Sequence, residues 1–101
     1  MKDRVVYMLL CSDGSFYVGV TMDLDLRVEW HNEGADPFCY TFSRRPVQPV
    51  WSETFGGWDK ALARERQVKG WSRAKKIALI HGDWSEIQKL SRVRGDRNPA
   101  R

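Results

Sequence analysis

The sequence has few of the residues that build disulfide scaffolds or metal clusters. Its 101 residues include only two cysteines, four prolines and two histidines. Cys11 and Cys39 stand far apart and form no CxxC ligand pair, and His31 and His81 do not complete a zinc pattern. We therefore expect both cysteines to be small packing residues of a reduced, intracellular protein.

Long apolar runs are also missing. A helix that spans a membrane needs about 20 apolar residues in a row. The run at residues 5–11 is much shorter and breaks at the polar segment 12–15. No small-residue cleavage site follows it, so it does not match a secretory signal peptide. These absences predict no membrane association and a cytoplasmic location.

The composition is that of an ordinary folded domain. Hydrophobic residues make up 42% of the chain and charged residues 30%, a balance that excludes disorder over most of its length. A chain of this length has room for one hydrophobic core. We predict a single domain over residues 1–94 and a flexible tail over residues 95–101.

The formal net charge of +4 is unevenly distributed along the chain. Residues 60–76 contain seven Lys or Arg against one acid, Glu65, whereas residues 22–36 contain five acids and only Arg27. Such a basic segment suits contact with phosphates, but a solvated helix surface explains the same charges equally well. Charge alone therefore leaves the partner open.

Two β-rich runs, residues 4–11 and 15–20, flank a turn that contains glycine, and this pattern predicts a hairpin. The length of the loop decides which side chains share a face. A two-residue loop at 13–14 would place Tyr7 and Tyr17 on opposite faces of the hairpin. A three-residue loop that ends with Gly14 in the left-handed conformation would place the two tyrosines on the same face.

We favour the three-residue loop because it gathers six large apolar side chains on one core face. In this register Tyr7 and Tyr17 also lie together beside Gly19, which has no side chain to crowd them. The predicted core face consists of Val6, Met8, Leu10, Phe16, Val18 and Val20.

The rest of the pattern predicts an α+β fold with a small three-stranded antiparallel sheet flanked by helices. Thr21 or Asp23 caps a first helix that runs to about Asn32. A strand at 49–55 contains proline, which is typical of an edge or a strand start. Further helices are expected at 58–69, 73–81 and 84–92, and the five tryptophans are expected to be core and helix-packing anchors: Trp30, Trp51, Trp58, Trp71 and Trp84.

Glu65 is the most informative single residue. The helix predicted at 58–69 has an inward stripe formed by Ala61, Leu62 and Val68, and Glu65 falls in its middle. A carboxylate on an inward face costs several kcal/mol unless a cation or hydrogen-bond donors compensate it. The compensation is either an ion pair with an arginine such as Arg27 or a bound divalent metal.

Taken together, the tyrosines, Gly19, Arg27, His31 and Glu65 resemble the motif of the GIY-YIG nuclease superfamily. This superfamily includes homing endonucleases and structure-specific junction endonucleases. The resemblance runs from about Arg4 to Ile80 and is greatest to the small, stand-alone bacterial branch related to the junction-endonuclease domain. The segments that carry this likeness are 17–21, 44–47 and 72–76.

The resemblance implies a role for each matched residue. Tyr7 and Tyr17 match the tyrosines of the two motif halves, Gly19 the close-packed glycine, Arg27 the catalytic arginine, His31 a position that holds His or Tyr, and Glu65 the metal-binding glutamate. The chain departs from the pattern in three places. The first half lacks its glycine, Val18 replaces the usual isoleucine, and no asparagine matches the one in a later helix, since Asn98 lies in the predicted tail.

The implied function is a metal-dependent endonuclease that hydrolyses phosphodiester bonds in DNA, including branched or damaged structures met in DNA repair. A tyrosine-activated water attacks, Arg27 stabilises the phosphate, and Glu65 holds Mg²⁺ or Mn²⁺. A partner protein would supply specificity. The alternatives are a catalytically weak nucleic-acid-binding module on the same scaffold and a protein-interaction domain.

Contacts to the nucleic-acid backbone are expected from aromatic and basic residues outside this motif. Phosphate contacts of this kind position a duplex without reading its bases. For the lysines, a solvated surface explains the sequence equally well. The candidates are Tyr40, Arg44 and Arg45 in the loop before the third strand, and Lys69, Arg73, Lys75 and Lys76 on the later helices.

Overall fold

A computed structural model describes residues 3–92. The chain divides into two compact units, Met1–Glu65 and Arg66–Arg101, and the boundary falls inside helix α2 (Trp58–Lys69). The prediction of a single domain over residues 1–94 stays a prediction. The predicted tail at 95–101 lies outside the described residues.

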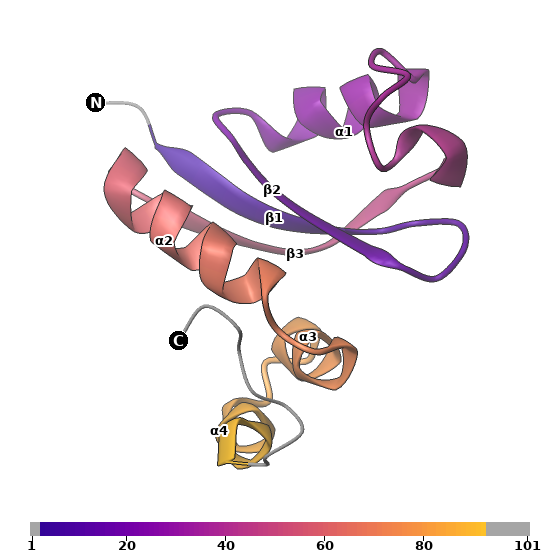
Figure 1. Ribbon diagram of the computed structural model, residues 1–101. Helices are drawn as coiled ribbons and strands as arrows, with labels where there is room; N and C mark the ends of the chain where they lie inside the picture. The colour runs from indigo at the N-terminus through magenta and orange to yellow at the C-terminus, as the bar shows by residue number, and fades with distance from the viewer. Residues whose placement is uncertain (1–2, 93–101) are drawn as a thin grey trace. The chain divides into compact units, whose positions relative to one another are not determined.

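The first unit is built on a three-stranded antiparallel sheet (Figure 1). Strand β1 (Arg4–Leu10) lies in the centre, between β2 (Phe16–Thr21) and β3 (Gln48–Phe55). The register between β1 and β3 shifts between Met8 and Leu9, and Pro49 pairs with Leu9 at that shift. The predicted sheet and the edge position of its proline-containing strand are confirmed.

The hairpin between β1 and β2 has the predicted three-residue loop. The Cys11 amide donates a hydrogen bond to the Ser15 carbonyl at 2.9 Å, and Gly14 has a φ of 85°. Glycine adopts this left-handed conformation without a steric penalty. Tyr7 therefore pairs with Gly19, and Tyr17 lies on the same face of the sheet.

Both faces of the sheet are buried, whereas the sequence predicted a single core face. Val6, Met8 and Val18 are buried as expected, while the other predicted members of that face, Leu10, Phe16 and Val20, are only partly buried. On the opposite face Tyr7, Leu9 and Cys11 are equally inaccessible. The prediction was wrong in assigning one face to the core, because a sheet covered by helices on both sides needs apolar side chains on both.

Helix α1 (Leu24–Glu33) covers the face that carries Tyr7. Leu24 and Val28 contact the cluster formed by Tyr7, Leu9, Cys11 and Val47. The Asp23 side chain accepts a hydrogen bond from the Leu26 amide at 3.1 Å, which identifies Asp23 as the predicted cap. The helix thus begins and packs as its sequence indicates.

The α2 residues that belong to the first unit face the other side of the sheet. Ala61 is fully buried, and the Arg64 guanidinium lies 3.3 Å from the Glu53 carboxylate of β3. The Arg4 guanidinium of β1 lies 4.9 Å from the centre of the Trp58 ring. Trp58 is nevertheless largely exposed, so the prediction that it anchors the core was wrong.

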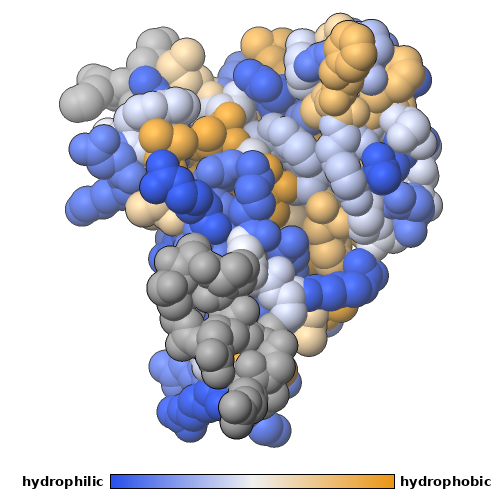
Figure 2. All heavy atoms as spheres, viewed as in Figure 1, coloured by the Kyte–Doolittle hydropathy of each residue, from blue (hydrophilic) through white to orange (hydrophobic). Residues whose placement is uncertain are grey.

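The end of α1 is tied to the start of β3 by one side chain. Asn32 Oδ1 accepts a hydrogen bond from the Val47 amide at 2.7 Å, and Asn32 Nδ2 donates to the Val47 carbonyl at 3.0 Å. The connecting loop contains a short 3-10 turn (Phe42–Arg44) and a cis Arg45–Pro46 peptide bond. Hydrophobic side chains are exposed over α1 and this loop (Figure 2), among them Phe38, which is 96% exposed.

The second unit contains the end of α2 followed by α3 (Arg73–Ile80) and α4 (Trp84–Arg92). The Ser72 hydroxyl caps α3 by accepting from the Lys75 amide at 3.2 Å, as predicted. The buried apolar residues of this unit are Val68, Trp71, Ala78, Leu79 and Ile87. Trp84 is largely exposed, so its predicted anchor role was also wrong.

None of the helices described in either unit is long and apolar enough to cross a membrane.

Candidate active site

The two tyrosines lie together on the α1 face of the hairpin. Their ring centres are 6.3 Å apart, and Tyr7 is 1% exposed whereas Tyr17 is half-buried. A Cβ atom at Gly19 would lie 2.5 Å from the Tyr7 hydroxyl oxygen, which is closer than real Cβ contacts come. Gly19 therefore has the close-packed position that the sequence predicted for it.

His31 of α1 reaches the same place. Its Nε2 is 3.0 Å from the Tyr7 hydroxyl, its ring centre is 5.1 Å from that of Tyr17, and it is 2% exposed. Burial lowers the pKa of His31, and the neighbouring Arg27 lowers it further. The imidazole is therefore neutral at pH 7.

The other imidazole nitrogen of His31 contacts two residues of the loop before β3. Nδ1 lies 2.7 Å from the Thr41 hydroxyl, and Thr41 is 1% exposed. The Thr41 hydroxyl donates to Cys39 Sγ at 3.4 Å, and that sulfur lies 3.8 Å from Nδ1. Sequence reasoning missed both contacts, because neither residue stands at a recognisable spacing from the motif.

The two cysteines differ in their surroundings. Cys11 is buried beside Tyr7 and Leu9, and burial raises the pKa of its thiol, as expected of a packing residue. Cys39 is only half-buried, and a hydrogen bond between its thiol and the Tyr17 hydroxyl contributes to raising the pKa of Tyr17. Cys39 was predicted as a small packing residue, and its sulfur in addition accepts a hydrogen bond from the Thr41 hydroxyl beside His31.

Arg27 and Glu65 act on the tyrosine pair from two helices. The positive charge of Arg27 lowers the pKa of Tyr7 and of Tyr17, while the negative charge of Glu65 raises both. Burial is the largest influence and raises both pKa values above that of an ordinary tyrosine. Both phenols therefore hold their protons at neutral pH. The lowered tyrosine pKa that base catalysis requires is not present in the protein alone.

Tyr40 extends the aromatic cluster toward the surface. Its ring stacks on Tyr17 with the centres 6.3 Å apart and an angle of 20° between the planes. The Arg44 guanidinium lies 3.8 Å from the Tyr40 ring centre, and its Nε forms an ion pair with Asp13 at 3.0 Å. Of the predicted nucleic-acid contacts, Tyr40 thus adjoins Tyr17, and Arg44 adjoins Tyr40.

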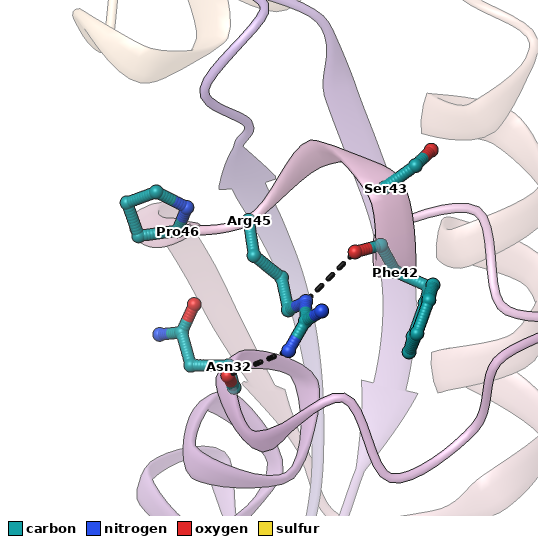
Figure 3. A pocket seen from close by; sticks show the side chains of 5 residues that line it. All are labelled: Asn32, Phe42, Ser43, Arg45 and Pro46. Carbon is teal, nitrogen blue, oxygen red and sulfur yellow. Dashed lines mark hydrogen bonds between the residues drawn. The ribbon is translucent and has the colours of Figure 1, made fainter.

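Arg45 lines a pocket of about 550 Å³ with Asn32, Phe42, Ser43 and Pro46 (Figure 3). Its Nε donates to the Phe42 carbonyl at 2.7 Å, and its Nη1 donates to the Asn32 carbonyl at 3.5 Å. The guanidinium therefore holds the loop against the end of α1. Neither Tyr7 nor Tyr17 nor His31 lines this pocket, so the pocket is separate from the cluster that these three residues form.

The other predicted backbone-binding residues belong to the second unit. Lys69 and Arg73 are exposed, and Lys76 is half-buried, with a pKa that is lowered by burial and by Lys69. Lys75 is only 5% exposed, and its ammonium lies 4.7 Å from the Trp71 ring centre. Lys75 is thus part of the packing of its own unit rather than of its surface. Asn98, the one asparagine considered for the missing motif position, lies outside the described residues.

The donor set around Glu65 suits some metals better than others. Within residues 3–92 no group of three or more His, Cys, Asp or Glu side chains could surround an ion. Zinc sites use three or four such ligands, whereas Mg²⁺ is held by one or two carboxylates and keeps several waters. A half-buried carboxylate whose charge acts on both tyrosines therefore fits a hydrated Mg²⁺ or Mn²⁺ ion and does not fit zinc.

A family model described as the GIY-YIG catalytic domain matches residues 4–78. The chain belongs to the GIY-YIG family. The match covers all five residues that the sequence predicted to be catalytic, from Tyr7 to Glu65. The GIY-YIG domain defines a nuclease superfamily whose members generally use divalent metals.

Relatives of this GIY-YIG chain are small bacterial proteins of similar length. The UPF0213 proteins of Staphylococcus aureus strains Mu3 and Mu50 are each 44% identical to it over 80 residues, covering 79% of this chain and 96% of the relative. A solution structure of the UPF0213 protein BH0048 from Bacillus halodurans matches with a TM-score of 0.52 and 36% identity. This match covers 90% of this chain and 99% of the other. The predicted α+β fold and the small stand-alone branch are thereby confirmed.

Proposed function

We propose that this protein is a divalent-metal-dependent endonuclease that hydrolyses phosphodiester bonds in DNA, including branched or damaged structures. One observation carries the proposal: Tyr7, Tyr17 and His31 contact one another, and the charges of Arg27 and Glu65 act on both phenols. A role in DNA repair, with a partner protein that supplies specificity, belongs to the same proposal.

Arg27 binds the scissile phosphate. Its planar guanidinium can donate two parallel hydrogen bonds to phosphoryl oxygens, and its charge is permanent. The Trp30 ring, whose centre lies 5.0 Å from the Arg27 guanidinium carbon, limits the directions that this side chain can take. Preorganised positive charge of this kind stabilises the negative charge that develops during attack on phosphorus.

Tyr17 orients the attacking water, since it is the more accessible of the two phenols. As the new bond to phosphorus forms, the water passes a proton to the Tyr7 oxygen, and the Tyr7 proton moves to Nε2 of neutral His31. The bond from phosphorus to the leaving oxygen breaks, and that oxygen takes a proton from solvent. The imidazole is thus the final acceptor of the water's proton.

Glu65 holds the metal in this proposal. A divalent cation bound there would supply positive charge to the phosphate and the leaving oxygen, and it would offset the raising effect of Glu65 on the tyrosine pKa values.

Cleavage assays on supercoiled, single-stranded and branched DNA test the proposal. We expect cleavage in Mg²⁺ or Mn²⁺, and none after chelation with EDTA. The raised pKa of both phenols favours a second candidate, a nucleic-acid-binding module with weak catalysis. Binding that persists while cleavage is absent with every metal tested would support that module and rule out the nuclease.

Glu65→Gln removes the carboxylate charge with little change in size, so it tests the metal ligand directly. We expect the cleavage rate to fall at least about a hundredfold, as when one charged group of a catalytic site is removed, while the melting temperature stays close to that of the wild type. Glu86→Gln, at another half-buried glutamate, is the matched control and should cleave normally. Full activity in Glu65→Gln would remove Glu65 from the site.

A further inference from the structure

Thr41 lies outside the matched motif residues, yet its hydroxyl makes the shortest contact to His31. The Thr41 oxygen is 2.7 Å from Nδ1, while the Tyr7 hydroxyl is 3.0 Å from Nε2. All three side chains are at most 2% exposed. Because buried polar groups need partners, the positions of the protons in this chain of contacts can be assigned by matching donors with acceptors.

The matching starts from Tyr7. In the part of the chain that the structure describes, the Tyr7 hydroxyl has one hydrogen-bond partner, His31 Nε2. In the free protein, before substrate and the attacking water reach Tyr7, an imidazole proton on Nε2 would be donated to the Tyr7 oxygen, and the phenolic proton would be buried without an acceptor. A buried donor without a partner is costly. Nε2 is therefore the acceptor, and the imidazole proton is on Nδ1.

The same matching accounts for Thr41 and Cys39. With its proton on Nδ1, the imidazole donates to the Thr41 oxygen, and the Thr41 hydroxyl donates to Cys39 Sγ at 3.4 Å. Every hydrogen from Tyr7 to Thr41 then has an acceptor. The Cys39 sulfur is 3.8 Å from Nδ1 and is thus a weaker alternative acceptor than the Thr41 oxygen.

We propose that Thr41 is a positioning residue that fixes neutral His31 as its Nδ1–H tautomer, so that Nε2 is always available to accept the Tyr7 proton. The orientation of a catalytic imidazole is often set by the partner of its other nitrogen. Here that partner is a neutral hydroxyl, which orients the imidazole without adding a charge that would raise the pKa of His31. The assignment of the tautomer stands on its own, whereas its effect on cleavage rests on the proposed function.

Nitrogen NMR of ¹⁵N-labelled protein tests the tautomer without any cleavage. In the wild type we expect the Nδ1 signal of His31 at the position of a protonated nitrogen and the Nε2 signal at that of an unprotonated one. His81→Gln removes the other histidine and so assigns the signals. A wild-type protein whose His31 carries its proton on Nε2 would overturn the proposal.

Two substitutions separate the hydroxyl from the shape of Thr41. Thr41→Val keeps the shape and removes the hydroxyl, so we expect the Nδ1–H population to fall and the cleavage rate to drop about tenfold or more, as for a lost buried hydrogen bond. Thr41→Ser keeps the hydroxyl and should restore both readouts. Thermal melting of each variant shows whether it folds.

The two proposals fail in different ways. Wild-type tautomer and wild-type cleavage in a folded Thr41→Val would overturn the role of Thr41 and leave the nuclease standing. Loss of the Nδ1–H form in Thr41→Val, with no cleavage by any version of the protein, would support the positioning role and reject the nuclease. If Thr41→Val does not fold, two other measurements decide whether Thr41 positions His31. These are the tautomer of His31 in the wild type, and whether Thr41→Ser has the wild-type tautomer and cleavage rate.

Discussion

At the scale of single residues, the site depends on how burial acts on groups that can ionise. Burial raises the pKa of both tyrosines and lowers that of His31, so the cluster is neutral at pH 7. The positive charge of Arg27 and the negative charge of Glu65 act on both phenols. The neutral state leaves His31 able to accept a proton and both phenols able to donate hydrogen bonds.

The lowered pKa of His31 predicts a dependence of stability on pH. The unfolded chain binds a proton at His31 near pH 6.5, whereas the folded protein binds it only at lower pH. The free energy of unfolding should therefore decrease as the pH falls below about 6.5, with a slope from His31 of at most about 1.4 kcal/mol per pH unit. Urea unfolding of the wild type between pH 7 and pH 5 measures this decrease.

His31→Gln should lack this contribution and show a flatter profile over the same range. His81→Gln removes an exposed histidine and should keep the wild-type slope. Equal slopes for the wild type and His31→Gln would contradict the assignment of a neutral, buried imidazole.

At the scale of elements, the pairing of β1 with β2 decides whether the tyrosines meet. The three-residue loop sets Tyr7 opposite Gly19 and keeps Tyr17 on the same face. A shift of one residue would turn one tyrosine to the other side of the sheet. The turn at Gly14 is therefore as necessary to the site as the side chains themselves.

Gly19→Ala tests this packing. The added methyl group would lie 2.5 Å from the Tyr7 hydroxyl oxygen, so the ring must move and its bond to His31 should weaken. We expect a loss of about 1–3 kcal/mol in the free energy of unfolding, which is typical of overpacking. Gly57→Ala, where a Cβ would meet nothing within 4 Å, should change stability by less than about 0.5 kcal/mol. Chemical denaturation of both variants measures the difference, and equal stability would mean that Tyr7 adapts without cost.

At the scale of the whole molecule, the net charge of +4 governs association with a polyanion. If the protein binds nucleic acid as proposed, the logarithm of its affinity should fall linearly with the logarithm of the salt concentration. Arg73→Gln should reduce that slope by about one, as the loss of one phosphate contact does. Lys75→Met, at a buried position beside Trp71, should leave the slope unchanged. Fluorescence anisotropy over a salt series measures the slope for each variant. A wild-type affinity that does not change with salt concentration would reject nucleic acid as the partner.

The sequence by itself determined the elements and most of the residues that meet. Helix caps such as Asp23 and Ser72, the glycine of the hairpin loop and the alternation within β1 and β2 are local signals, and a local signal does not depend on the rest of the chain. The motif supplied Tyr7, Tyr17, Arg27, His31 and Glu65. The structure brings Tyr7, Tyr17 and His31 into contact, and the charges of Arg27 and Glu65 act on both phenols.

Only the tertiary structure decided what surrounds them. The burial of both faces of the sheet, the exposure of Trp58 and Trp84, and the contacts of Thr41 and Cys39 with His31 depend on where distant segments return in space. Residue type and spacing along the chain do not show which distant segments will come together in the fold. Thr41 comes ten positions after His31 along the chain, and it is the folding of the intervening loop that places its hydroxyl on Nδ1.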